Sequence, residues 1–170
     1  MSYVIQYMDS IDKARVVLLP DEHGVKHFQK YYTELSISAS ELHEDKVKLV
    51  FIRKLLKRLR LLDKRDLPTG IDSISFDFEI DVDGISYTRP LDIVKKLGKS
   101  VVYELRIDIS DFNWYFRATF FPKYHQDELY YCVVYPFVKV PGEENPTDEF
   151  RDLTHNVFED TRLYPDKYFN

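Results

Sequence analysis

The segment VYELRIDISDFNWYFRATFF, residues 102–121, predicts two neighbouring strands of an antiparallel sheet, at about 100–109 and 112–121. Apolar and polar side chains alternate along both halves, which is the pattern of a strand with one buried face. The two-residue link has the length of a hairpin connection. The apolar positions are Leu105 and Ile107 on the first strand, and Trp114, Phe116, Ala118 and Phe120 on the second. We expect these apolar faces to pack against a layer of helices.

A second hairpin is predicted upstream of this segment. Residues 71–80 alternate strictly between apolar and polar side chains, and Asp83 with Gly84 marks a turn to a returning strand at residues 85–88. We interpret the hairpin, about residues 71–88, as an insertion.

The remaining short elements are predicted from turn residues and alternation. Pro90 is expected to open a short helical turn over residues 91–97. A third main strand follows at residues 129–139, and two further short strands are expected at residues 3–7 and 14–19.

Three helices are predicted to cover the sheet. The strongest pattern places apolar side chains at three- and four-residue spacing from Val47 to Leu62. A shorter helix precedes it at about residues 25–35, and a final helix begins after Pro146 and ends before Pro165. The sequence therefore predicts one α+β domain over residues 1–170. N-terminal helices pack on a C-terminal antiparallel sheet, with an inserted hairpin and a C-terminal helix.

Composition indicates a compact intracellular protein. The chain is 44% apolar and 31% charged, which is ordinary for a globular domain. Cys132 is the sole cysteine, so no intrachain disulfide can form. The N-terminus lacks a signal-peptide pattern, and no stretch approaches the roughly 18 apolar residues of a membrane span. We therefore expect a cytoplasmic protein with no membrane partner.

No metal or cofactor site is predicted. His23 and His27 lie four residues apart, but the glutamate of a zincin motif is missing. The sequence contains no glycine-rich phosphate loop and no serine nucleophile elbow. We expect no metal ligands and no small-molecule cofactor.

Charge is distributed unevenly along the chain. The net charge is −5, which argues against a general nucleic-acid binder. Residues 46–65 nevertheless hold nine Lys or Arg and one acid, a local balance of +8. Two interpretations stay open. These cations, Lys54, Lys57 and Arg58 among them, form a contact surface for RNA or an acidic partner, or they are the solvated face of a core helix.

Strand alternation predicts a polar face on the central sheet. If the apolar sets face the helices, Arg106 and Arg117 project together from the other side of adjacent strands. On the third strand one parity holds Tyr131, Tyr135, Phe137 and Lys139, and Tyr115 shares the parity of Arg117. Cations of this kind can hold a phosphodiester, and tyrosines can stack unpaired bases. The simpler alternative is that Glu104, Arg106 and Asp108 form cross-strand ion pairs.

Four segments in order resemble one family of bacterial toxins. They are LDIVKKLG at residues 91–98, VYELRI at 102–107, WYFRATFF at 114–121 and YPFVK at 135–139. The pattern resembles the phage-derived HigB-like toxins of the RelE superfamily, which belong to type II toxin–antitoxin systems. LPDEHG at residues 19–24, with Phe28, is similar to the first strand-to-helix junction of that family.

The resemblance implies a function as well as a fold. It implies a RelE-like domain and ribosome-dependent, metal-independent cleavage of mRNA by 2′-hydroxyl attack, silenced by a cognate antitoxin protein. Arg106, Arg117 and Lys139 fall on the basic positions of its motifs, with phosphate binding and transition-state stabilisation as their implied roles. Lys54, Lys57, Arg58, Tyr115 and Tyr135 are the predicted RNA-binding residues.

A second function class stays open from the sequence. The same fold can serve as a catalytically inactive, prophage-encoded module that binds proteins in regulation. Eight acids and three bases follow Val140, and this acidic C-terminal segment favours protein contact over RNA contact. An RNA-binding module without cleavage is a further alternative.

Overall fold

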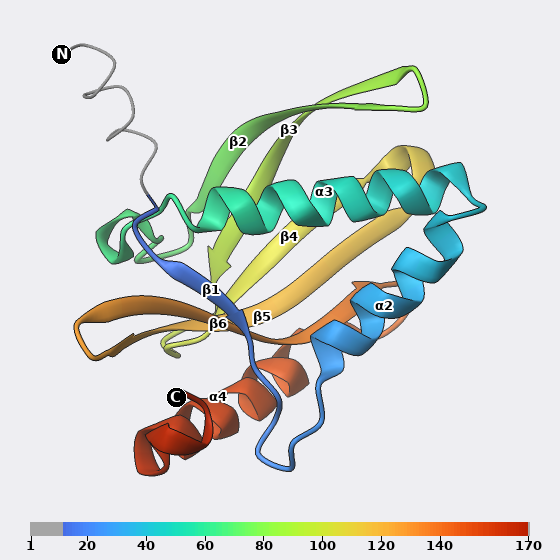
Figure 1. Cartoon of the computed structure of the whole chain (residues 1–170). Coiled ribbons are helices and arrows are strands. Elements are labelled where there is room, and N and C mark those ends of the chain that lie inside the picture. Colours follow the sequence, from blue (N-terminus) through green and yellow to red (C-terminus); the bar gives the residue numbers. More distant parts are fainter. Residues whose placement is uncertain (1–11, 170) are drawn as a thin grey trace, which may run out of the picture.

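A six-stranded mixed sheet forms the centre of the molecule (Figure 1). The computed structural model describes residues 12–169. The strand order is β1-β6-β5-β4-β3-β2. The strands are β1 (Arg15–Leu18), β2 (Ser73–Val82), β3 (Ile85–Lys96), β4 (Tyr103–Ile109), β5 (Trp114–His125) and β6 (Glu128–Lys139). Neighbours are antiparallel except β1, which runs parallel to β6.

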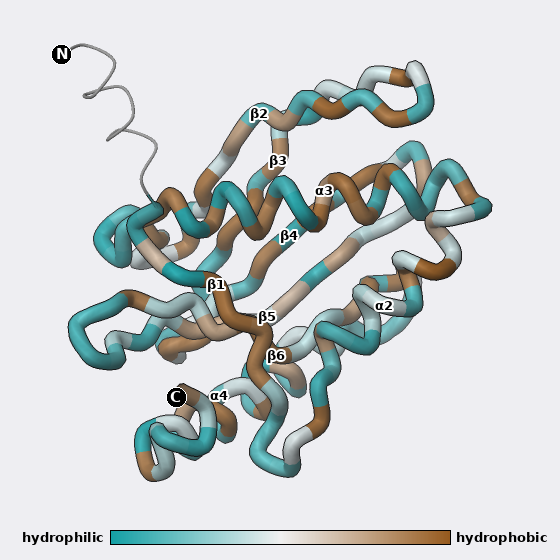
Figure 2. The backbone as a smooth tube through the Cα atoms, viewed as in Figure 1, coloured by the Kyte–Doolittle hydropathy of each residue, from teal (hydrophilic) through white to brown (hydrophobic). Residues whose placement is uncertain are grey.

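Two helices cover one face of the sheet. They are α2 (His27–Ala39) and α3 (His43–Leu59), and they lie across the sheet with the β2–β3 hairpin projecting past α3 (Figure 1). Their apolar faces join the inward side chains of the strands in the larger core, which contains Phe51, Ile52, Leu55, Phe116 and Phe120. Along α3, apolar and polar residues alternate in the way an amphipathic helix requires (Figure 2).

A third helix covers part of the opposite face. Helix α4 (Thr147–Leu163) packs against β5 and β6 through a smaller core that holds Phe121, Cys132, Val134 and Val157. The hydroxyl oxygens of Thr119 on β5 and Thr154 on α4 lie 2.5 Å apart, and both side chains are fully buried. Side chains of even number on β5 therefore face α2 and α3, and those of odd number face α4.

The α+β class and most elements are confirmed, with corrections to the sheet type and to residues 91–97. The sheet is mixed rather than purely antiparallel, because β1 enters at the edge parallel to β6. Residues 91–97 do not form a helical turn, because β3 continues through Pro90 to Lys96. At Pro90 only β2 flanks β3, since β4 pairs with β3 from Val94 onward. A proline, which lacks an N–H donor, is tolerated at such an unpaired edge. The strand predicted at residues 3–7 lies outside the described residues.

The common parity expected for Tyr131 and Tyr135 is wrong. Phe120 pairs with Val133, whereas Ala118 pairs with Pro136, so β6 carries one extra residue across this interval. Such a bulge shifts the alternation of a strand. Tyr131 therefore lies in the core beneath α2 and α3, and Tyr135 lies in the core beneath α4.

The hydroxyl of Tyr131 anchors the chain that follows α3. It donates a 2.6 Å hydrogen bond to the carbonyl of Leu62, and the tyrosine is fully buried. We expect Tyr131→Phe to lower the unfolding free energy by about 1–2 kcal/mol, because a buried carbonyl loses its donor. Urea denaturation measures the change. Tyr130→Phe, at an exposed hydroxyl bonded to Glu128, is the matched control and should leave stability unaltered. Equal effects of the two substitutions would contradict this account.

Candidate functional site

The predicted catalytic cations lie on one face of three neighbouring strands. Arg106 on β4 is directly opposite Arg117 on β5, and Tyr115 on β5 is directly opposite Lys139 on β6. Directly paired residues project to the same side of a sheet. All four side chains therefore lie on the face that carries α4, as the alternation predicts.

A buried carboxylate lies between the two arginines. Glu104 is 2% exposed, and its Oε1 atom lies 3.4 Å from Nε of Arg117 and 3.6 Å from Nε of Arg106. Asp108 accepts a 2.6 Å hydrogen bond from Nη1 of Arg117. Thr147, the first residue of α4, donates a 3.3 Å hydrogen bond to Glu104. This network joins β4, β5 and the start of α4.

The two arginines are held differently. Arg117 is 3% exposed and is paired with two carboxylates; its Nη1 donates to Asp108 and to the carbonyl of Phe116, and its buried Nε forms no hydrogen bond within the described residues. The Arg106 side chain is 22% exposed, and no hydrogen bond engages its terminal nitrogens within residues 12–169. The cross-strand ion pairs considered from the sequence are therefore present. Of the predicted pair, Arg106 is the one with donors available to a ligand.

Lys139 borders a hollow of 260 Å³ beside this network. Tyr115 and Arg117 line it together with the loop of residues 140–146. Burial lowers the pKa of Lys139, and the nearby cations Arg117, Arg106 and Lys95 lower it further, against the opposing effect of Glu104. A bound anion would offset the repulsion among these cations.

The surroundings of the network are acidic. Glu143 and Glu144 lie on the loop wall of the hollow, and Asp92 and Asp108 flank Arg106 at a neighbouring hollow of 350 Å³. On β2 the core-facing positions include Phe78 and Ile80, and the intervening positions are exposed acids, Asp77, Glu79 and Asp81. These carboxylates repel a polyanion approaching this face.

The predicted RNA-binding cations of α3 lie across the sheet from this network. Lys54 donates a 2.6 Å hydrogen bond to the carbonyl of Glu79, and the guanidinium of Arg58 lies 4.0 Å from the ring centre of Phe76. Lys57 forms no ion pair within the described part of the chain. Because α3 covers the opposite face, the structure does not bring Lys54, Lys57 and Arg58 together with Arg106 and Lys139.

The two predicted stacking tyrosines have different environments. Tyr115 is partly exposed and lines the hollow beside Lys139. Tyr135 is 6% exposed, and its ring packs between His27 and Phe150 at centroid distances of 4.7 and 5.7 Å. Burial raises the pKa of Tyr135 to about 12. Tyr135 is thus a core residue, and only Tyr115 has a ring placed to meet a ligand.

Glu104 belongs to the network of this candidate site, and the sequence interpretation did not include it among the site residues. The alternation of residues 102–108 already placed Glu104 on the same face as Arg106 and Arg117, but alternation gives no measure of burial. Among residues 12–169, no cluster of three or more His, Cys, Asp or Glu side chains is arranged to hold a metal ion.

Scans against protein-family models, curated proteins and solved structures each found no match. No helix within residues 12–169 is long and apolar enough to cross a membrane.

Lys139 gives a prediction for pH. Its folded-state pKa lies below 10.5, so the unfolded chain binds the proton more tightly. Ionised Lys139 therefore lowers stability at neutral pH, and this cost declines as pH rises through the lowered pKa towards 10.5. We expect Lys139→Met to be at least as stable as the parent protein at pH 7, with the advantage shrinking at alkaline pH. Urea denaturation from pH 7 to alkaline pH measures the difference in unfolding free energy between the variant and the parent protein. A variant less stable than the parent at pH 7 would contradict a lowered pKa for Lys139.

Proposed function

We propose that this protein is the toxin component of a type II toxin–antitoxin system, a ribosome-dependent mRNA endoribonuclease of the RelE/HigB kind. The observation that carries the proposal is the convergence of Arg106, Arg117 and Lys139 on one face of β4, β5 and β6, beside Tyr115 and a hollow. These are the positions at which the family motifs carry their basic residues.

The side chains would divide the work according to their environments. Arg106 and Lys139 contact the scissile phosphate, since both are partly exposed. Arg117 is a positioning residue, which holds Glu104 and Asp108 in place. Tyr115 stacks on a base beside the cleaved bond.

The proposed reaction needs charge stabilisation above all. The 2′-oxygen of a ribose loses its proton and attacks the adjacent phosphorus, the bond to the 5′-oxygen breaks, and that oxygen takes up a proton. The products are a 2′,3′-cyclic phosphate and a 5′-hydroxyl. The intermediate phosphorane carries two negative charges, which Arg106 and Lys139 would stabilise.

A catalytically inactive protein-binding module is the second candidate. The ion pairs of Arg117 and the acids around Arg106 and Lys139 favour it, because both weaken the attraction for RNA. The ion pairs of Arg117 are explained by their contribution to fold stability, without any contact to a substrate. The two candidates differ in whether the cations of this face have any role beyond stability.

Induced expression tests the proposal. We expect growth arrest, together with mRNA fragments that bear 5′-hydroxyl ends on translating ribosomes. Arg106→Ala should reduce cleavage by about a hundredfold or more, since it removes one charge contact to the transition state. Cleavage is measured by mapping RNA 5′ ends in a purified translation system.

The control is Arg162→Ala, which removes an exposed arginine paired with Glu159 on α4 and should leave cleavage unaltered. Far-UV circular dichroism establishes that each variant is folded. Absence of cleavage by the folded parent protein supports the binding module. Cleavage that persists in the Arg106→Ala variant removes the site assignment but leaves the nuclease class standing.

A further inference from the structure

Strand β1 presents an open edge at the end of the sheet. It pairs only with β6, and the N–H of Leu19 donates a 2.9 Å hydrogen bond to the carbonyl of Val133. Because the peptide groups of a parallel strand alternate between its two edges, those of Val16 and Leu18 point away from β6. No partner for these groups lies within residues 12–169. An unpaired edge of this kind can accept a further strand.

A hollow of 430 Å³ lies beside this edge, on the face of α2 and α3. Its apolar part consists of Val16, Leu18 and Leu56. Leu18 is 39% exposed although it belongs to a strand. A strand added to β1 would direct alternate side chains towards these apolar groups.

Cations surround the apolar part of the hollow. Arg53, Lys57 and Arg60 line it together with Tyr32, whose hydroxyl accepts a 2.6 Å hydrogen bond from Nε of Arg53. No carboxylate lies within ion-pairing distance of any of the three cations in the part of the chain that the structure describes. These three cations are therefore not engaged in ion pairs there, in contrast to Arg117.

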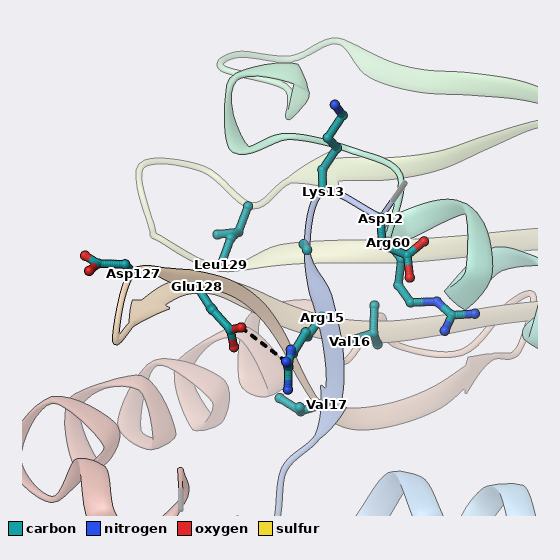
Figure 3. Close-up of a pocket in the computed structure, with 10 residues that line it drawn as sticks. Asp12, Lys13, Arg15, Val16, Val17, Arg60, Asp127, Glu128 and Leu129 are labelled. Atoms are coloured by element: carbon teal, nitrogen blue, oxygen red, sulfur yellow. Dashed lines mark hydrogen bonds and ion pairs between the residues drawn. The ribbon is translucent and has the colours of Figure 1, made fainter. Parts of the chain in front are cut away.

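The neighbouring hollow at the start of β1 has a different character. It measures 580 Å³, and Arg15 on its wall is paired with Glu128 at 3.1 Å (Figure 3). Figure 3 places Val16 and Arg60 on one side of β1 and Arg15 with Glu128 on the other. Acids and bases are mixed around this larger hollow, so its charge does not select a partner.

We propose that the open edge of β1 and the hollow beside it bind an extended acidic segment of a partner protein, in which apolar and acidic residues alternate. The backbone of the segment pairs with β1, its apolar side chains contact Val16, Leu18 and Leu56, and its carboxylates meet Arg53, Lys57 and Arg60. The open strand edge fits a polypeptide better than RNA, because only a polypeptide backbone can continue the pairing of the sheet. The surface lies across the sheet from Arg106, so this inference is independent of the nuclease proposal.

The test uses a fluorescein-labelled octapeptide of alternating valine and glutamate, with binding to the full chain measured by fluorescence anisotropy. Val16→Pro removes an outward N–H without affecting the bonds to β6, and Lys57→Glu reverses one charge. We expect each to weaken binding about tenfold or more. Lys99→Glu makes the same charge change at an exposed lysine of the β3–β4 turn and should bind as the parent protein does.

Other outcomes overturn the proposal. A peptide that binds all four proteins equally, or none of them, shows that the edge is not a peptide site. Oligouridine that binds more tightly than the peptide, with sensitivity to Lys57→Glu and not to Val16→Pro, makes the surface an RNA contact. Self-association that Val16→Pro abolishes makes a second copy the occupant. Binding that appears only after residues 1–11 are deleted makes the chain's own N-terminus the occupant.

Discussion

The buried carboxylate of Glu104 is the constraint on which this face of the molecule depends. A charge that is 2% exposed is tolerated in a protein only when it is paired and hydrogen-bonded. Arg117 on the adjacent strand supplies the main charge, and Thr147 supplies a hydroxyl from the start of α4. The network therefore joins the start of α4 to the sheet, next to the wall of the hollow beside Lys139. Lys139 borders this hollow, and Arg106 borders the neighbouring one.

Two groups of cations lie on opposite faces of the sheet. Arg53 and Lys57 of α3 lie beside β1 on one face, whereas Arg106 and Arg117 of the Glu104 network lie on the other. One extended polyanion cannot contact both sets without passing around the sheet. The two proposals therefore concern different faces, the proposed phosphate contact at Arg106 and Lys139 and the proposed protein contact at β1. The basic segment of the sequence contributes cations to the second proposal and not to the first.

Alternation and helical periodicity were enough to predict most of the fold. They placed the three helices, the hairpin that begins near residue 71 and the common face of Arg106, Arg117 and Lys139, because burial of one face imposes these patterns. That hairpin is part of the central sheet, since β3 pairs with β4. They could not predict the parallel pairing of β1 or the bulge in β6, since both depend on contacts distant in the sequence. Pro90 indicated a helical turn because proline at a helix start and proline at an unpaired strand edge look the same locally. Ion pairing of Glu104, Arg106 and Asp108 was an open alternative. Alternation gives no measure of burial, so it could not predict that Arg117 is the arginine paired most closely with these carboxylates.

A double-mutant cycle on Glu104 and Arg117 tests the central claim most directly. Urea denaturation of Glu104→Gln, Arg117→Met and the double variant gives their unfolding free energies. If the buried carboxylate depends on Arg117, each single substitution is strongly destabilising, and the double variant recovers about 2 kcal/mol relative to the sum of the two. Strictly additive effects would contradict the account, because they would mean that the two side chains stabilise the fold independently.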